Sequence, residues 1–444
     1  MKFEDSLVKT YPAHLDYVRE KWDAALEATE FDAVVIFGGA LHMIFLDDMP
    51  YPFKVNAHLK WWAPVIGNPN CFLIYTPGTK PILLYYNPVD FWHMVAAKPD
   101  SYWTSSFDIR YVTSLDEALT HMPSTGHVAL VGEPLALEKF KFGESNPKAL
   151  LDRIHHHRSW KTDYELDCLR EANRIGARGH VAAEKAYRAG ASEFEIHLDY
   201  LRATEHVEHQ LPYGNIIALN EHASVLHYQH QSLVKPLKRP SFLIDAGAQF
   251  NGYASDITRT WAAAGSEFQA FIDRNEKMQL ELCDLVTPGH DYREIHLTTH
   301  FKVGEILREF DLTTVDAQEA VDKGITRAFF PHGVGHYIGL QVHDVAGFSK
   351  DGCGATIDTP ENQPFLRLTR MIEERQVFTI EPGIYIIDSL LDGLKKNGGG
   401  AGVNWKKVDE FRPFGGVRIE DDVIVTESGH ENMTRDAFAE LETG

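Results

Sequence analysis

The stretch FLIDAGAQFNGYASDITRTW, residues 242–261, restricts the fold more than any other part of the sequence. Its centre, Asn251-Gly252, is the strongest short-range signal for a two-residue β-hairpin turn, because both residues tolerate a positive φ. Counting outward from that turn places Asp245 on one strand opposite Thr258 on the other. We therefore expect a hairpin whose register is set by its turn.

Two aspartates of this hairpin are expected on one face. Side chains alternate between the faces of a strand, so Asp256 shares the face of Thr258 and hence of Asp245. Such diagonal neighbours are roughly 6–8 Å apart at Cα, and carboxylates that close repel on a buried face unless one is protonated or a cation lies between them. Two solvated acids on an open sheet face are the alternative, and this stretch alone leaves both open.

Composition narrows the class of protein. The 444 residues suffice for two domains, and 44% hydrophobic with 24% charged residues is typical of a folded soluble chain. A net charge of −21 without a basic cluster makes nucleic acid and anionic membranes poor partners. No apolar signal core and no run of 18 apolar residues occurs, so we expect a cytoplasmic protein. The four cysteines lie far apart, which indicates neither a disulfide framework nor a thiolate zinc site.

Two domains are expected, over residues 1–160 and 161–444. In the first, the runs FDAVVIFGG, CFLIYTPG, KPILLYY and HVALVGE alternate with helical stretches, which predicts an α/β domain with a mixed sheet. The second reads as α+β. Capping-box spacings predict helices from Thr162 to about Arg188 and from Ser192 onward, and further helices are expected near 266–287 and 291–309. The segment KKNGGGAG, residues 395–402, is predicted to be a mobile loop.

The second domain holds most residues with catalytic chemistry. The segment FPHGVGHYIGLQVHD carries His332, His336 and His343 among glycines that argue against a helix. Glu381 ends the apolar run VFTI, just before Pro382-Gly383, where a turn is expected.

The segment FGGVRIEDDVIV, residues 414–425, is predicted to be one strand in which Arg418, Glu420 and Asp422 share a face. Buried acids in strands are rare unless they are paired or bind metal. Asp245, Asp256, Glu381 and Glu420 together supply four negative charges, which balance two divalent cations. Oxygen-rich ligation with one imidazole favours manganese, magnesium or related hard ions.

The order DAG, SDITRT, HGVGHYIGLQVHD, FTIEPGIY and GGVRIEDDV closely resembles the pita-bread metallopeptidases, the fold of methionine aminopeptidase, aminopeptidase P and prolidase. The segments FLDDMPYPFKVN, PYGNIIALNEHASVLHY and PFLRLTRMIEERQVFTIEPGIY look most like bacterial Xaa-Pro dipeptidases (prolidases), including the organophosphorus acid anhydrolase type. The resemblance covers essentially the whole chain. It implies an α/β N-terminal domain followed by an α+β pita-bread, creatinase- and aminopeptidase-like catalytic domain.

The resemblance also implies a dinuclear centre, most simply of two Mn²⁺ ions. Its ligands would be Asp245, Asp256, His336, Glu381 and Glu420, with Asp256 and Glu420 bridging the two ions. Glu381 would also transfer the proton. The further candidates for catalysis and substrate binding are His227, His343, His332, Arg418, Arg370 and Tyr213. Arg418 would either orient Glu420 or face the substrate carboxylate, and Arg370 would either close the pocket or be a surface residue. For Tyr213 the alternative to a pocket position is an aromatic residue at a strand edge.

The expected function is metal-dependent hydrolysis of Xaa-Pro dipeptides by a homodimeric metalloprotease, with side hydrolysis of organophosphorus triesters and fluoridates. An aminopeptidase P acting on longer peptides is the nearest alternative. A non-catalytic binding module of the same fold is another, although intact ligands argue against it. A creatinase-like amidinohydrolase shares the architecture but dispenses with these ligands.

Other conspicuous residues have simpler interpretations. We expect His155, His156 and His157 to be surface or packing residues rather than a metal tract. We likewise expect Cys168 and Cys283 to pack in helices. By resemblance to a dimerising family, Asp47 and Asp48 with the pair Trp61-Trp62 could form a cap over a partner's site.

Overall fold

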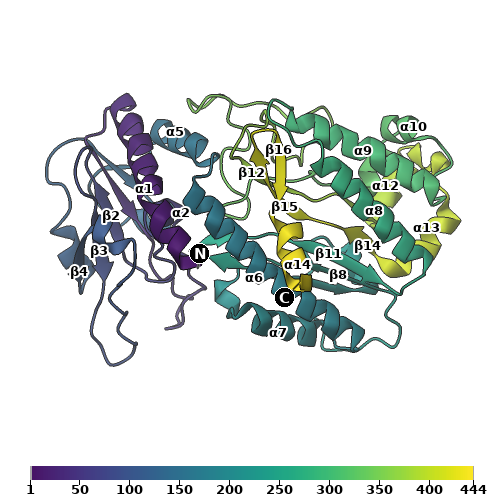
Figure 1. Cartoon of the computed structure of the whole chain (residues 1–444), viewed down its shortest axis with the longest axis horizontal. Helices are drawn as coiled ribbons and strands as arrows, with labels where there is room; N and C mark the ends of the chain where they lie inside the picture. The colour runs from purple at the N-terminus through teal and green to yellow at the C-terminus, as the bar shows by residue number, and fades with distance from the viewer. Residues whose placement is uncertain (1–2, 444) are drawn as a thin grey trace. The chain divides into compact units, whose positions relative to one another are not determined.

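The computed structural model describes residues 3–443, which form two compact units (Figure 1). The first unit contains the chain up to Cys168, with Asn251–Tyr253 and Ser349–Thr356. The second contains Leu169–Phe250, Ala254–Phe348 and the chain from Ile357 onward. A single cut near residue 160 does not anticipate the two short segments that join the first unit.

The first unit is built on a six-stranded sheet in the order β4-β3-β2-β1-β5-β6. β1 pairs antiparallel with β2 and parallel with β5, so the sheet is mixed, as predicted. The predicted runs contain β1, β2, β3 and β5, whereas the half-exposed DIRYV of β4 and the two residues of β6 lacked a clear apolar pattern. The elements are α1 Phe3–Ala28, β1 Ala33–Phe37, α2 Ala57–Trp62, β2 Phe72–Tyr75, β3 Ile82–Tyr86, β4 Asp108–Val112, α3 Leu115–Leu119, β5 Val128–Val131, α4 Pro134–Leu137, β6 Glu144–Ser145 and α5 Lys148–Arg158.

Two details of the first unit bear on the sequence-based expectations. Trp61 and Trp62 of α2 are fully buried, so they are core residues of the first unit, whereas Asp47 and Asp48 are exposed. The histidine tract lies on α5, where His155 Nε2 is 3.0 Å from His58 Nε2 and His156 Nδ1 is 2.8 Å from Ser349 Oγ. The tract therefore makes separate packing contacts, as expected.

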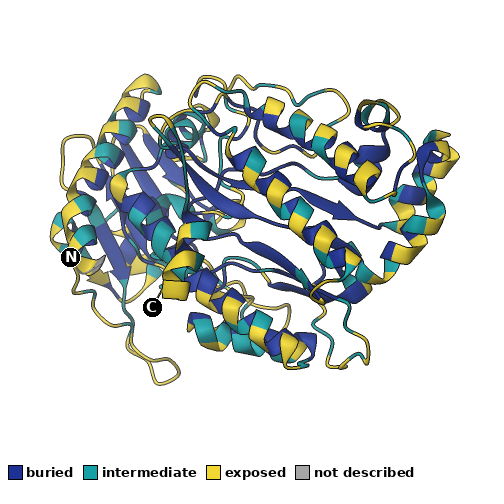
Figure 2. Cartoon of the chain, turned by 45° about the vertical axis from the view of Figure 1, so that its right-hand side comes forward, coloured by how far each residue is buried: buried dark blue, intermediate teal, exposed yellow. Residues whose placement is uncertain are grey.

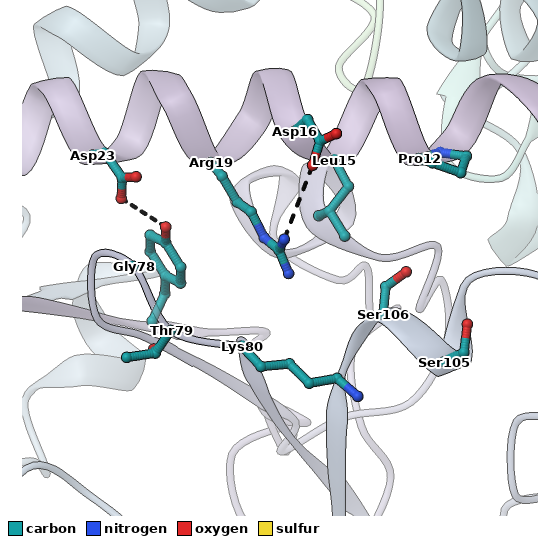
Figure 3. A pocket seen from close by; sticks show the side chains of 11 residues that line it. Pro12, Leu15, Asp16, Arg19, Asp23, Gly78, Thr79, Lys80, Ser105 and Ser106 are labelled. Atoms are coloured by element: carbon teal, nitrogen blue, oxygen red, sulfur yellow. Dashed lines mark hydrogen bonds and ion pairs between the residues drawn. The ribbon is translucent and has the colours of Figure 1, made fainter.

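A pocket of about 530 Å³ opens in the first unit beside α1 (Figure 3). Arg19 and Lys80 line it, Arg19 is paired with Asp16 at 4.0 Å, and Tyr75 donates a 2.6 Å hydrogen bond to Asp23. None of the predicted site residues lines this pocket.

The second unit begins within α6 Asp163–Arg188 and has buried strands covered by helices that are exposed on their outer sides (Figure 2). The remaining elements are α7 Glu193–Thr204, β7 Ile216–Leu219, β8 Ser241–Asp245, β9 Gln249–Phe250, β10 Tyr253–Ala254, β11 Thr258–Ala262, α8 Glu267–Cys283, α9 Tyr292–Glu309, α10 Ala317–Asp322, α11 Ile325–Phe329, β12 Val377–Ile380, β13 Gly383–Tyr385, α12 Asp388–Lys396, α13 Trp405–Phe411, β14 Gly416–Arg418, β15 Asp421–Thr426, β16 Gly429–Asn432 and α14 Met433–Thr443.

Local sequence signals explain the helices well. Thr162 N–H donates to Glu165 Oε2 at 2.9 Å, and Ser192 with Glu195 forms a reciprocal capping box, so both predicted helix starts are confirmed. α8 and α9 lie within the predicted ranges 266–287 and 291–309. Their apolar faces pack with β12, β14 and β15 in one core that includes Cys283. Cys168 is also fully buried, so both cysteines are packing residues.

Two predictions for this unit were wrong. Residues 414–425 form two strands rather than one, because the backbone of Glu420 pairs with Thr258 of β11 and the chain changes partner there. Residues 395–402 are not a simple loop, since they comprise the end of α12 and a 3₁₀ turn over Gly399–Gly402. The carbonyl of Gly402 accepts a 2.6 Å hydrogen bond from Thr313 Oγ1.

Among the described residues, no helix is both long and apolar enough to cross a membrane.

Candidate metal centre

The hairpin around Asn251-Gly252 has the predicted register. Asn251 and Gly252 both adopt positive φ, 51° and 87°, and β8 pairs with β11 so that Asp245 lies opposite Thr258. β7 completes this three-stranded sheet on the other side of β8.

Asp245 and Asp256 point to the same side of the hairpin. The hydroxyl oxygen of Tyr213 lies 2.8 Å from Oδ1 of Asp245 and 2.5 Å from Oδ1 of Asp256. A single phenol between the two carboxylates requires that they face one another, as the alternation of side chains predicted.

His336 joins this pair from an irregular glycine-rich segment that follows α11. The backbone around it lies along β12, where His336 N–H donates to Thr379 Oγ1 and Thr379 N–H donates to the His336 carbonyl. A Cβ at Gly335 would lie 2.0 Å from the Thr379 carbonyl oxygen, so this close approach requires glycine. The result is that His336 Nε2 lies 3.5 Å from Asp256 Oδ2 and 3.6 Å from Glu381 Oε1.

Glu420 and Arg418 enter from the strand pair beside β11. Thr258 Oγ1 donates a 2.6 Å hydrogen bond to Glu420 Oε2. Arg418 Nη2 donates to Asp245 Oδ2 at 2.7 Å, and its Nε donates to Thr258 Oγ1 at 3.2 Å. Its Nη1 donates to Tyr385 Oη at 2.8 Å. Each guanidinium nitrogen is thus engaged, and Arg418 contacts Asp245 directly and Glu420 through Thr258.

Buried charge makes this cluster a poor place for four ionised carboxylates without cations. Burial raises the pKa of Glu381 to about 7, and burial with the neighbouring carboxylates raises the pKa of Glu420 well above its ordinary value. Burial also raises the pKa of Asp245, although Arg418 opposes this. Burial lowers the pKa of His336, but Asp256 and Glu381 outweigh it and raise that pKa to about 9.

A divalent cation fits the donor set that causes these shifts. One ligand atom each from Asp256, His336 and Glu420 lies within 4.8 Å of the others. Carboxylate oxygens and one imidazole are ligands for hard divalent ions, and positive charge would let the carboxylates ionise together.

The other predicted site residues lie at varying distances from this cluster. His343 is exposed, and its ring centroid is 4.3 Å from that of His336. His332 lies 3.6 Å from Glu381 and 2.8 Å from the Tyr385 hydroxyl. His227 is exposed.

Arg370 is not a surface residue, because it is 5% exposed. It pairs with Glu373 at 3.1 Å and lies over the ring of Tyr337. Neither contact belongs to the carboxylate cluster.

Several groups at the site were missed. Thr258 holds Glu420, Tyr385 links His332 to Arg418, and Asp422 Oδ2 accepts a 3.1 Å hydrogen bond from Asp256 N–H. Thr258 was detectable, since the hairpin count already placed it opposite Asp245. Tyr385 carried no such signal, because its contacts join residues far apart in the chain.

Comparison with known proteins agrees with this geometry. Residues 9–156 match the family model described as the N-terminal domain of Xaa-Pro dipeptidase, and residues 167–427 match that of metallopeptidase family M24. Proteins named Xaa-Pro dipeptidase from Shewanella putrefaciens and Shewanella oneidensis are 51% and 50% identical, over 97% of this chain and 99% of each relative.

Solved structures share the fold at lower identity. Aminopeptidase P from Escherichia coli with the inhibitor Pro-Leu matches with a TM-score of 0.72 and 22% identity, over 97% of this chain and 99% of that one. Aminopeptidase PepP from Pseudomonas aeruginosa matches with the same TM-score and identity. The architecture is therefore the pita-bread fold, as the sequence resemblance implied. The chain belongs to metallopeptidase family M24, a family of metal-dependent peptidases, and carries the N-terminal domain found in Xaa-Pro dipeptidases.

Proposed function

We propose that this protein hydrolyses Xaa-Pro dipeptides with two divalent metal ions, most simply Mn²⁺. One observation carries the proposal, which is the convergence of four carboxylates and one imidazole from separate segments in a buried cluster. In the proposed centre the ligands are Asp245, Asp256, His336, Glu381 and Glu420. The names of the half-identical relatives support the dipeptide substrate.

The substrate explains why metal chemistry is useful. An Xaa-Pro bond has no amide N–H, so an enzyme cannot hold it through that group. When bound, divalent ions supply Lewis-acid chemistry that makes water a nucleophile near neutral pH and polarises the scissile carbonyl.

The residues of the chain supply proton transfer and positioning. Glu381 is the carboxylate we assign to accept the proton of the attacking water and return it to the proline nitrogen, because its Oε1 lies inside the proposed ligand set, 3.6 Å from His336 Nε2. His227 and His343 bind the substrate and stabilise the developing oxyanion. Tyr213, Arg418 and Thr258 hold the carboxylates in place, and His332 contacts both Glu381 and Tyr385.

The substrate assignment is tested by comparing Ala-Pro with Ala-Pro-Ala and longer peptides, using protein loaded with Mn²⁺. Rapid hydrolysis of Ala-Pro with little activity on the longer chains supports a dipeptidase. Preference for the longer peptides would instead support an aminopeptidase P. No hydrolysis of either by fully loaded protein would overturn both.

We also propose that the protein is a homodimer. Exposed apolar side chains in the first unit, at 86% for Phe45, 90% for Leu46, 86% for Phe91 and 96% for Met94, support this. Apolar surface of this kind commonly marks an interface. Light scattering of the purified protein should give twice the 50.2 kDa chain mass, and a monomer at micromolar concentration would contradict the proposal.

A further inference from the structure

His227 is carried by a long connection with little regular structure. β7 ends at Leu219 and β8 begins at Ser241, and between them the structure has only the short 3₁₀ helix Asn220–Ser224. Connections of this length without their own secondary structure tend to sample several conformations. A substrate-binding residue on such a segment needs an anchor elsewhere in the fold.

The carboxylate of Glu193, the first residue of α7, is that anchor. Its Oε1 accepts hydrogen bonds from Leu219 N–H at 2.8 Å and from His222 Nδ1 at 2.7 Å. Its Oε2 accepts from the Tyr228 hydroxyl and from Ser232 N–H, both at 2.8 Å. Four donors from residues 219–232 thus fill the acceptor positions of one carboxylate.

Burial makes these bonds strong and their loss costly. Glu193 is 1% exposed, and a buried carboxylate without partners is strongly unfavourable. The start of α7 does not depend on Glu193, because Ser192 and Glu195 already form the capping box. The side chain of Glu193 therefore serves the connection rather than the helix end.

Tyr228 transmits this anchoring to its neighbour His227. Tyr228 is 7% exposed, its hydroxyl contacts Glu193, and its ring stacks on His222 with centroids 4.5 Å apart. With Tyr228 fixed inward, the adjacent His227 is left exposed.

We propose that Glu193 is a positioning residue for the hydrolytic reaction, acting through Tyr228 to present His227 to the substrate. This inference rests on the proposed function, because it takes His227 as a substrate-binding residue. It assigns the positioning of the 220–240 connection to a residue of α7 that lies outside the proposed ligand set.

The test is a double-mutant cycle on Mn²⁺-loaded full-length protein, with kcat/KM for Ala-Pro and metal content measured for each variant. Glu193→Gln keeps the side-chain shape but turns an amide toward two of the donors. We expect it to lower kcat/KM by about 10- to 100-fold with two metals retained, because a misplacement of about 1 Å that originates far from the chemistry can cost about 100-fold. In the His227→Ala background the same change should cost nothing further, because its effect passes through His227.

A matched control and a milder variant complete the experiment. Glu184→Gln makes the same change at a half-buried residue of α6 that pairs with Arg188, and it should leave kcat/KM unchanged. Tyr228→Phe removes a single hydrogen bond, so it tests the inference even if Glu193→Gln fails to fold. Its loss should also vanish in the His227→Ala background.

Equal losses from Glu193→Gln with and without His227, or loss of metal, would overturn the inference while wild-type hydrolysis of Ala-Pro still supports the proposed function. Unimpaired His227→Ala would overturn the role of His227, and the inference with it. Failure of the wild type on Ala-Pro would instead refute the proposed function itself.

Discussion

Arg418 Nη2 donates a 2.7 Å hydrogen bond to Oδ2 of Asp245, and Arg418 is 4% exposed. The same guanidinium reaches Thr258, which holds Glu420, so one arginine supports carboxylates on two strands. A planar guanidinium that donates hydrogen bonds from all three nitrogens fixes the orientation of the carboxylates it supports and also balances their negative charge.

Arg418→Lys should therefore weaken the centre although the charge is kept. Lysine cannot reach Asp245, Thr258 and Tyr385 together, and we expect metal affinity or kcat/KM to fall about 10- to 100-fold. Titration of chelated protein with Mn²⁺, read by bound metal and by activity, measures both. Wild-type values for both quantities would contradict the orienting role.

Asp256→Asn should remove one metal ion and nearly all activity, because a carboxylate of the proposed ligand set becomes a neutral and weaker ligand. The side chain already contacts Tyr213 and approaches His336, so its shape is conserved while its charge is lost. Asp199→Asn on the exposed side of α7 is the matched control, and it should behave as wild type. Two retained ions with normal turnover in Asp256→Asn would refute the ligand assignment.

The pH dependence of stability should report the buried histidine His300, which is not one of the proposed metal ligands. Burial lowers its pKa to about 3, while the unfolded chain keeps a value near 6.5, so the unfolded state binds more protons between these values. The contribution of His300 to the free energy of unfolding is fully present above about pH 6.5. It is lost as the pH falls toward 3, by about 1.4 kcal/mol per pH unit.

His300→Asn removes this titration and should make stability less sensitive to acid. Thermal unfolding of both chelated proteins between pH 7 and pH 4.5 measures the effect, since chelation removes the contribution of metal binding. The melting temperature of the variant should fall less over this range than that of the wild type. Parallel curves would show that His300 is not held neutral in the folded state.

A phosphotriester resembles the tetrahedral intermediate of peptide hydrolysis, so the proposed centre should also hydrolyse p-nitrophenyl phosphotriesters slowly. Both activities should return in parallel as metal is added back to chelated protein, and Ala-Pro should inhibit the second reaction competitively. A phosphotriester rate that survives Asp256→Asn would place that reaction at another site.

Local sequence patterns were sufficient for much of the fold. The Asn251-Gly252 turn set a register that extends to Asp245 and Thr258, because the pairing of two residues across a hairpin determines which residues pair next along it. The helix starts at Thr162 and Ser192 could be predicted, because side chains of the first turn accept hydrogen bonds from backbone N–H groups close to them in sequence. Such interactions involve residues close in sequence, so a pattern can show them.

Contacts between distant segments were not visible in the pattern. Residues 414–425 read as one strand, but Glu420 pairs with Thr258, some 160 positions away, and the strand divides there. Tyr213 was expected to line a pocket or to be an aromatic residue at a strand edge, whereas its hydroxyl lies between Asp245 and Asp256. The anchoring of Tyr228 by Glu193 likewise depends on how α7 packs against the 220–240 connection.

The central claim is that two divalent ions held by this cluster perform the hydrolysis of Xaa-Pro dipeptides. Its most direct test is to titrate Mn²⁺ into chelated protein while counting bound ions and following Ala-Pro hydrolysis in the same samples. We predict an inactive chelated protein, two ions bound per chain at saturation, and activity that follows occupancy. Full Ala-Pro hydrolysis by protein that holds no metal would contradict the claim.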